Sequence, residues 1–356
     1  MTANTPKRLL ALDILRGITI AGMILVNNPG SWGHVYTPLE HAAFNGLTPT
    51  DLVFPFFMFI MGISTYISLR KYNFTYSHAT LRKIVKRTVV IFCIGLFLNL
   101  LAKSVFTHHL NFEELRYLGV MQRLAIGYGV TSLVAITVKH KYFPAIILVT
   151  LAVYFLLLAM GDGFNLSATN IVARFDVWAL GTSHMYHDGG MAFDPEGLLS
   201  TLPAVCHVMV GFYCGKLLFS AKDNDEKIQR LFLVGTILTF AGFLLSYGCP
   251  INKKVWSPTF VITTCGLASS FLALLIWIID IKGYQGWCVF FRSFGVFAEI
   301  MGILLGATGA SVFIYEKVLV PVLGNYPGSL AYALLYVLFC WSIVHILYKK
   351  GIYVKI

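Results

Sequence analysis

The chain has 356 residues, of which 57% are hydrophobic and only 12% charged, and it carries a formal net charge of +11 at pH 7. This composition lies outside the range of soluble globular domains, so it excludes soluble enzymes and indicates an integral membrane protein. The lysines and arginines concentrate in short segments between apolar runs, as membrane topology requires, and we therefore expect no nucleic-acid partner.

Ten apolar segments approach the ~20 residues that a helix needs to cross a bilayer. With glycine and proline as breakers, the predicted spans are residues 10–28, 50–69, 84–102, 117–138, 142–160, 198–219, 231–248, 257–279, 287–309 and 329–348. Residues 306–324 predict either an eleventh, broken span or an external re-entrant segment. The expected fold class is all-α, one polytopic helical bundle that forms a single domain over residues 1–356.

The first span is interrupted by charge. Lys7 and Arg8 precede it as in a signal sequence, but Asp13 and Arg16 break the apolar run, so we predict an uncleaved first span. Asp13 and Arg16 are three residues apart on one helix face, where mutual pairing or snorkelling towards water explains them as well as a functional role does.

Basic residues mark alternate connections between the spans. They are Arg70, Lys71, Arg82, Lys83, Lys86 and Arg87, then Lys139 and Lys141, then Lys222, Lys227 and Arg230. By the positive-inside rule these connections and the N-terminus are cytoplasmic, which places the protein in the inner membrane if it is bacterial. The seven cysteines lack C-x-x-C spacing, and the sequence predicts neither a disulfide framework nor a metal site.

The segment LEHAAFNGLTPTDLVFPFFMFIMG, which begins at Leu39, places polar residues at the outer end of the second span. His41, Asn45 and Asp51 lie there, and Asn27 ends the first span. Such groups can orient one imidazole nitrogen while the other acts as a nucleophile or base. The alternative is a solvated loop histidine without a role.

Other ionisable residues fall inside predicted spans, where each costs at least ~2.5 kcal/mol near the bilayer centre. Gln122 and Arg123 lie in the fourth span and Glu299 in the ninth. A functional cavity or a buried pair is the expected reason, and Asp51 or Asp194 is the expected partner of Arg123.

Three outer loops carry further polar residues. In FDPEGLLSTLPAV, Asp194 and Pro195 predict the start of a helix, with Glu196 as a candidate site residue. In GTSHMYHDGG the spacing of the histidines matches no strong metal motif, and we expect no metal. In PINKKVWSPTF, Lys253 and Trp256 suit a sugar that stacks on the indole, although interfacial anchoring explains the tryptophan equally well.

The runs RLLALDILRGITIAGMILVNN, HAAFNGLTPTDLVFPFFMFIMG, LRYLGVMQRLAIGY, FDPEGLLSTLPAV, INKKVWSPTF and LYKKGIYVKI together resemble the heparan-α-glucosaminide N-acetyltransferase family and its bacterial relatives. The resemblance implies acetyl transfer from cytosolic acetyl-CoA to a glucosamine-type amine on the opposite side of the membrane. It implies His41 as the catalytic histidine, Asn27 as an asparagine beside it, and a homodimer. The segment SFGVFAEIMG departs from the family's Gly-x-Asn pattern.

The expected site therefore has three parts. His41 and Asn27 are the catalytic candidates; the acceptor or channel-lining candidates are Asn45, Asp51, Arg116, Gln122, Arg123, Glu196, Lys253 and Trp256; the candidates for binding coenzyme A are Arg16, Lys83, Lys86 and Arg87. The expected partners are acetyl-CoA as acyl donor, a hexosamine-containing small molecule or glycan terminus, and the lipid bilayer. An amino-sugar permease, an inactive scaffold, another acyl donor, and either an acetyl-histidine route or direct transfer remain open.

Overall fold

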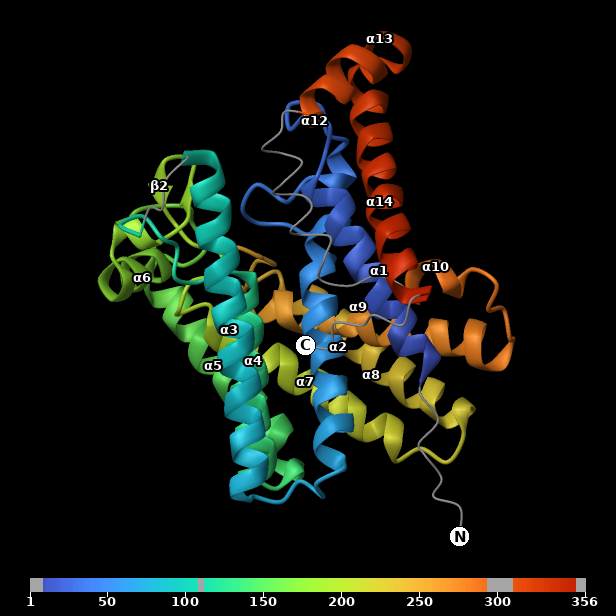
Figure 1. The fold of residues 1–356 in the computed structure, drawn as a ribbon. Helices are drawn as coiled ribbons and strands as arrows, with labels where there is room; N and C mark the ends of the chain where they lie inside the picture. The colour runs from blue at the N-terminus through green and yellow to red at the C-terminus, as the bar shows by residue number, and fades with distance from the viewer. Residues whose placement is uncertain (1–8, 108–111, 293–309, 350–356) are drawn as a thin grey trace.

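The computed structural model describes residues 9–107, 112–292 and 310–349, and in these residues almost all regular structure is helical (Figure 1). The elements in chain order are α1 (Leu10–Asn27), η1 (Thr37–Leu39), η2 (Pro49–Leu52), α2 (Val53–Arg70), α3 (His78–Thr107), α4 (Val120–Thr137), η3 (His140–Tyr142), α5 (Phe143–Met160), α6 (Ile171–Leu180), η4 (Thr182–His184), β1 (His187–Asp188), β2 (Met191–Ala192), α7 (Thr201–Phe219), α8 (Asn224–Leu245), α9 (Pro258–Leu275), η5 (Ile276–Ile281), α10 (Cys288–Arg292), α12 (Ala310–Phe313), η6 (Ile314–Leu319), α13 (Val320–Leu323) and α14 (Asn325–Lys349).

The prediction of an all-α polytopic bundle is confirmed. In the described part of the chain, nine helices are long and apolar enough to cross a membrane, and they correspond to nine of the ten predicted spans. Most of the remaining predicted span, residues 287–309, lies outside the described residues, and Glu299 lies there too. The described part of 306–324 consists of the short helical pieces α12, η6 and α13.

One predicted helix start was wrong. The sequence predicted a helix directly after Asp194, but α7 begins at Thr201. The Asp194 carboxylate does accept a bond from the backbone N–H of Glu196, at 2.9 Å, as in a helix cap. Its other contacts go to Arg116 and to the backbone N–H of Tyr186, so residues 195–200 form turns instead of the first helical residues.

Helices α2 and α7 form the centre of the bundle. Most of α2 is buried, and its partner α7 is the most buried of the candidate spans. Glycines allow the two backbones to approach closely: a Cβ on Gly62 would overlap backbone atoms of Val208 and Phe212, and a Cβ on Gly211 would overlap the backbone of Phe59. Small residues at such crossings are typical of helix packing in membranes.

Substitution of Gly62 tests this contact. We expect Gly62→Ala to destabilise the bundle by about 1–3 kcal/mol, because the added methyl group forces α2 and α7 apart. The measurement is the thermal unfolding midpoint of the detergent-purified protein. Gly286→Ala is the matched control, since a Cβ at Gly286 meets no atom within 4 Å. Equal midpoints for the two variants would contradict the close approach.

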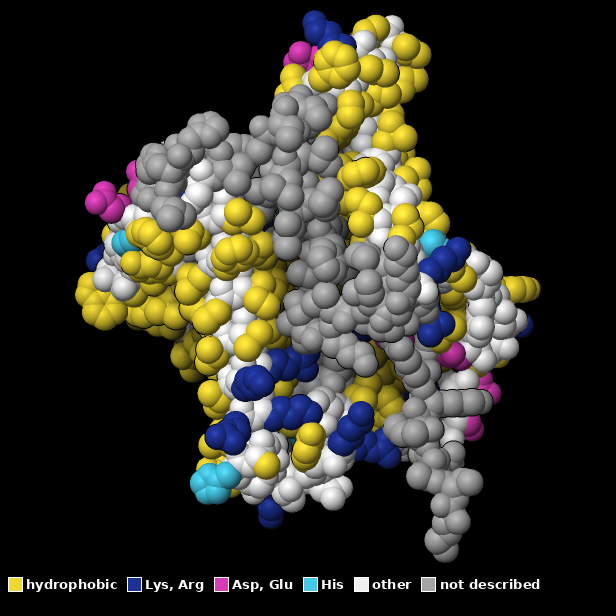
Figure 2. All heavy atoms as spheres, viewed as in Figure 1, with side chains coloured by type: hydrophobic (Ala, Val, Ile, Leu, Met, Phe, Trp, Pro, Cys, Tyr) yellow, Lys and Arg dark blue, Asp and Glu magenta, His cyan; other side chains and the backbone are white. Residues whose placement is uncertain are grey.

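Helix α2 connects two chemically different ends of the molecule. Asp51 lies immediately before it and Arg70 ends it, so at 1.5 Å per residue the two positions are roughly 30 Å apart. Figure 2 shows lysine and arginine side chains gathered at the end where the loop between α2 and α3 lies in Figure 1. The segment with His41 belongs to the opposite end, about one hydrocarbon thickness away.

Candidate active site

The buried carboxylate of Asp51 organises the segment that carries His41. Thr48 and Asp51 form a capping box at η2, with Pro49 at its first position. Asp51 Oδ2 accepts bonds from the backbone N–H groups of Ala42 and Thr48, each at 3.1 Å, and from the Thr48 hydroxyl at 3.0 Å. These contacts fix the carboxylate and leave Oδ1 directed at His41.

The imidazole of His41 is held by this carboxylate and is still open to solvent. Its Nδ1 lies 2.7 Å from Asp51 Oδ1. The carboxylate is a pure acceptor, so Nδ1 carries the proton of this bond and Nε2 of the neutral ring carries the lone pair. The His41 side chain is 46% exposed, whereas that of Asp51 is 1% exposed. A reactant can therefore reach the imidazole but cannot reach its carboxylate partner.

A second loop, Asn252 to Ser257, brings a lysine to the histidine. Lys253 Nζ lies 3.1 Å from His41 Nδ1 and 3.4 Å from Nε2. The loop is held by Ser257, which caps α9, and by the Asn252 side chain, which accepts a bond from the Val255 N–H. Asn252 Nδ2 also donates to Asn45 Oδ1 at 2.9 Å. Asn45 thus joins the lysine loop to the histidine loop.

Trp256 packs beneath this loop in the protein interior and is not on the surface. Its side chain is fully buried, with φ of 52°, a left-handed backbone conformation that is unusual for a bulky residue. The indole packs edge-on against Phe54 and Phe260 and receives the Arg123 guanidinium at 4.9 Å. The expected stacking of a sugar on an exposed indole is therefore wrong for this structure; here the indole supports the Lys253 loop from inside.

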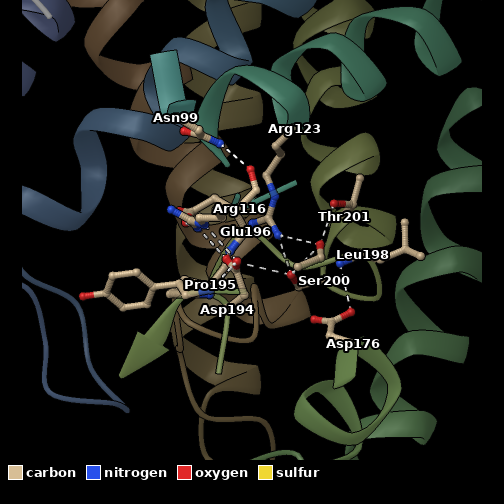
Figure 3. Close-up of polar contacts among 12 residues, drawn as sticks. Asn99, Arg116, Arg123, Asp176, Asp194, Pro195, Glu196, Leu198, Ser200 and Thr201 are labelled. Atoms are coloured by element: carbon tan, nitrogen blue, oxygen red, sulfur yellow. Dashed lines mark hydrogen bonds and ion pairs between the residues drawn. The ribbon is translucent and has the colours of Figure 1, made fainter. Parts of the chain in front are cut away.

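Arg123 also differs from its expected pairing. Its Nη2 donates to the Gly197 carbonyl at 3.2 Å and to the Ser200 hydroxyl, as Figure 3 shows, instead of bonding to Asp51 or Asp194. Its Nε and Nη1, and the amide of the preceding Gln122, are buried without a hydrogen-bond partner among the described residues. Arg123 therefore fixes the turn before α7, and the three N–H groups on its Nε and Nη1 have no hydrogen-bond acceptor among the described residues.

A network of one arginine and two carboxylates fixes the loop above α7 (Figure 3). Arg116 bonds Asp194 through Nε at 2.9 Å and through Nη2 at 2.5 Å, and Nη2 also reaches Glu196 at 2.7 Å. Burial opposes charge on Arg116, but these carboxylates raise its pKa. Burial likewise opposes charge on Glu196, while Arg116, Arg123 and Lys253 lower its pKa. Glu196 is thus an ionised group between the network and the Lys253 loop.

Asp176 holds the same turn from α6. Its Oδ1 accepts bonds from the backbone N–H groups of Leu198 and Leu199, at 2.9 and 3.0 Å. Burial raises the pKa of Asp176 to about 6, although these two bonds act in the opposite direction.

The basic candidates for coenzyme A lie apart from the His41 cluster. Arg16 contacts Asp13 at 3.4 Å and the Ser64 hydroxyl at 2.9 Å, which confirms the pairing considered for the first span. Lys83 donates to the Tyr72 hydroxyl at 2.8 Å, and the Arg87 guanidinium lies 4.6 Å from the centre of the Tyr128 ring. Lys86 is exposed on α3. These residues belong to the basic half of the bundle, and Arg16, Lys83 and Arg87 make these contacts with different partners.

Asn27 is exposed at the last residue of α1, and no hydrogen bond joins it to His41 in the described part of the chain. Its catalytic role stays a prediction. Lys253 was predicted as an acceptor-region residue, but its contact with His41, 212 residues away in the chain, was not predicted. His207, a fully buried histidine of α7 whose ring centre lies 6.0 Å from that of Trp256, was not predicted either.

Comparison with known proteins gives a consistent result. The family model described as "Heparan-alpha-glucosaminide N-acetyltransferase, catalytic" matches residues 8–247. Heparan-alpha-glucosaminide N-acetyltransferase of Mus musculus is 28% identical over 341 aligned residues, which cover 79% of this chain and 50% of the mouse protein. The Homo sapiens protein of the same name is 29% identical over 339 residues, covering 78% of this chain and 50% of the human protein. The chain thus spans about half the length of the curated relatives it matches.

Proposed function

The chain belongs to the heparan-α-glucosaminide N-acetyltransferase family, and from that premise we propose that it transfers the acetyl group of acetyl-CoA to the amine of a glucosamine-type sugar. The observation that carries the proposal is the hydrogen bond of 2.7 Å between His41 Nδ1 and the buried Asp51 carboxylate. This bond favours the neutral tautomer in which Nε2 of an exposed imidazole is unprotonated, which is the form that acyl transfer requires.

Two routes of transfer use the same nitrogen. In the first, His41 Nε2 attacks the thioester carbonyl, the C–S bond breaks and coenzyme A leaves as a thiolate; the sugar amine then displaces the imidazole from the acetyl group. In the second, Nε2 takes a proton from the sugar ammonium, and the free amine attacks the thioester directly. The C–S bond then breaks, coenzyme A leaves as a thiolate, and the thiolate takes up the second proton that the amine nitrogen loses as it becomes an amide. Asp51 stabilises the imidazolium that forms when Nε2 takes up a proton.

The charges around His41 suit an amine acceptor. A sugar ammonium is cationic near neutral pH, and Glu196 is an ionised carboxylate close enough to Lys253 and Arg123 to interact with both. We place the acceptor amine between Glu196 and His41. Asn45 fixes the neighbouring loop, and Arg116 orients the Glu196 carboxylate.

We place the nucleotide of acetyl-CoA at the opposite, basic end of the bundle, which we assign to the cytosol. Phosphates pair well with lysine and arginine, and Arg16, Lys83, Lys86 and Arg87 are the residues proposed to contact them. With roughly 30 Å between the two ends, the pantetheine arm has to enter the bundle so that its acetyl group reaches His41. In this arrangement only the acetyl group crosses to the acceptor side.

The proposal is tested by the transfer of labelled acetyl from acetyl-CoA to glucosamine with detergent-purified protein. We expect labelled N-acetylglucosamine and release of free coenzyme A in equal amounts. Uptake of labelled glucosamine into proteoliposomes, without transfer and without binding of coenzyme A, would instead support an amino-sugar permease.

The role of the Asp51 charge can be tested with asparagine, which has nearly the same size and shape as aspartate. We expect Asp51→Asn to lower the transfer rate on the order of 10²-fold, because the amide no longer selects the tautomer with a free Nε2 or stabilises the imidazolium. The measurement is the rate of coenzyme A release at saturating substrates. Asp188→Asn is the matched control, since Asp188 pairs with Lys254 and not with His41. Equal rates in the two variants would remove Asp51 from the mechanism.

A further inference from the structure

Lys253 makes an unusual contact with the proposed catalytic histidine. Its Nζ lies within 3.4 Å of both ring nitrogens of His41 and 3.6 Å from Asp51 Oδ1. A lysine ammonium has three donors and no acceptor, so it cannot accept the proton of Nδ1. The contact between Lys253 and Asp51 is therefore an ion pair. It places the positively charged Lys253 ammonium beside the His41 imidazole.

The burial of Lys253 and its charged neighbours affect the pKa of its ammonium group. Its side chain is 17% exposed. Burial lowers the pKa of Lys253 and outweighs the effect of the Asp51 and Glu196 carboxylates, which raise it, while Arg123 acts in the same direction as burial. Of the charged residues adjacent in the chain to His41 and Lys253, Glu40 is exposed, and Lys254 is paired with Asp188.

The two neighbours of His41 have opposite effects on its protonation. The Asp51 carboxylate stabilises an imidazolium, whereas an ammonium at 3.1 Å destabilises it, because like charges disfavour ionisation. Since Asp51 also pairs with Lys253, it is only partly available to a second cation. A neutral imidazole satisfies all three groups: its Nδ1–H bonds to Asp51, and its unprotonated Nε2 lies 3.4 Å from the Lys253 ammonium.

We infer that Lys253 is a positioning residue that holds His41 in its neutral form by placing an ammonium against the imidazole and the Asp51 carboxylate. The inference deepens the proposed function, on which its catalytic meaning rests. Without this charge, Asp51 and His41 would form a simple carboxylate–imidazolium pair, and a protonated Nε2 can neither attack a thioester nor accept a proton.

The test reads the protonation of His41 directly. Diethyl pyrocarbonate acylates neutral imidazole, so the rate of modification of the His41-containing peptide, followed by mass spectrometry over a pH series, gives the midpoint of its titration. We expect this midpoint to rise by roughly one pH unit or more in Lys253→Met and in Lys253→Gln. Lys253→Arg keeps the charge and should stay close to the wild type. Asp51→Asn should lower the midpoint.

Lys254→Met is the matched control, because it removes the same charge from the adjacent position without a contact to His41. An unchanged midpoint in both neutral variants at Lys253 would overturn the inference. So would a shift in Lys254→Met or in Lys253→Arg as large as that in Lys253→Met. The modification needs no turnover, so a chain that fails to transfer acetyl groups can still show the shift, and the two ideas fail separately.

Discussion

His41→Ala should lower acetyl transfer from acetyl-CoA to glucosamine by at least about 10³-fold and leave the fold unchanged. The expected loss is large because the imidazole is the nucleophile or base in both proposed routes. The fold should survive because the side chain is 46% exposed and the carboxylate that binds it keeps its bonds to Ala42 and Thr48. The measurement is labelled transfer at equal concentrations of folded protein.

His34→Ala is the matched control for this experiment. His34 belongs to the same loop and packs edge-on against Tyr326, with Nδ1 at 3.3 Å from the Tyr315 hydroxyl, but it has no contact with His41. Its substitution should leave transfer within a few-fold of the wild type. If His41→Ala retained more than a tenth of the wild-type rate, or if both variants lost activity equally, the assignment of His41 would be wrong.

The histidine experiment also separates the two routes. With labelled acetyl-CoA and no acceptor, the acetyl-histidine route predicts rapid release of about one coenzyme A per active site in the wild type and none in His41→Ala. Direct transfer predicts no release before the sugar is added. A burst that persisted in His41→Ala would point to another nucleophile.

The helical fold could be predicted from the sequence because each span is a long apolar segment, and a segment in lipid must form all its backbone hydrogen bonds internally, as a helix does. The sequence also placed Asp51 among the polar residues that can orient the His41 imidazole. That Asp51 is the residue that binds His41 is known only from the structure, where the capping box of Thr48 and Asp51 turns the carboxylate back towards the preceding loop. The interpretation of Trp256 failed because a tryptophan in a polar loop is equally compatible with a surface position and with burial. Only the packing of Phe54, Phe260 and Arg123 around it distinguishes the two.

Long-range contacts could not be predicted in the same way. Lys253 reaches His41 because Asn252 bonds to Asn45, and nothing in the local pattern of either loop specifies that match. Asp194 looked like a helix cap because its capping bond is local, whereas its partner Arg116 lies 78 residues earlier in the chain. Each missed feature involves a polar side chain whose partner is determined by tertiary packing.

Asp194→Ala should destabilise the protein by about 3–5 kcal/mol, more than any other substitution considered. The carboxylate is fully buried and makes two bonds with Arg116, and it accepts the backbone N–H groups of Tyr186 and Glu196. Its removal leaves the Arg116 guanidinium, whose side chain is 27% exposed, with one carboxylate partner in place of two, and it leaves two backbone N–H groups without an acceptor. Thermal unfolding in detergent measures the loss.

The size of this effect depends on the unpaired charge and not on lost packing, which a second substitution separates. Asp188→Ala removes a carboxylate that is 23% exposed from its ion pair with Lys254, which is 20% exposed, and we expect a smaller change, of about 1 kcal/mol. In the triple variant Arg116→Met, Asp194→Leu and Glu196→Gln, all three charges of the network are removed, and we expect part of the stability to return. If the triple variant were as unstable as Asp194→Ala, the network would stabilise the loop through shape alone. Recovery would show that Arg116, Asp194 and Glu196 act as one electrostatic unit.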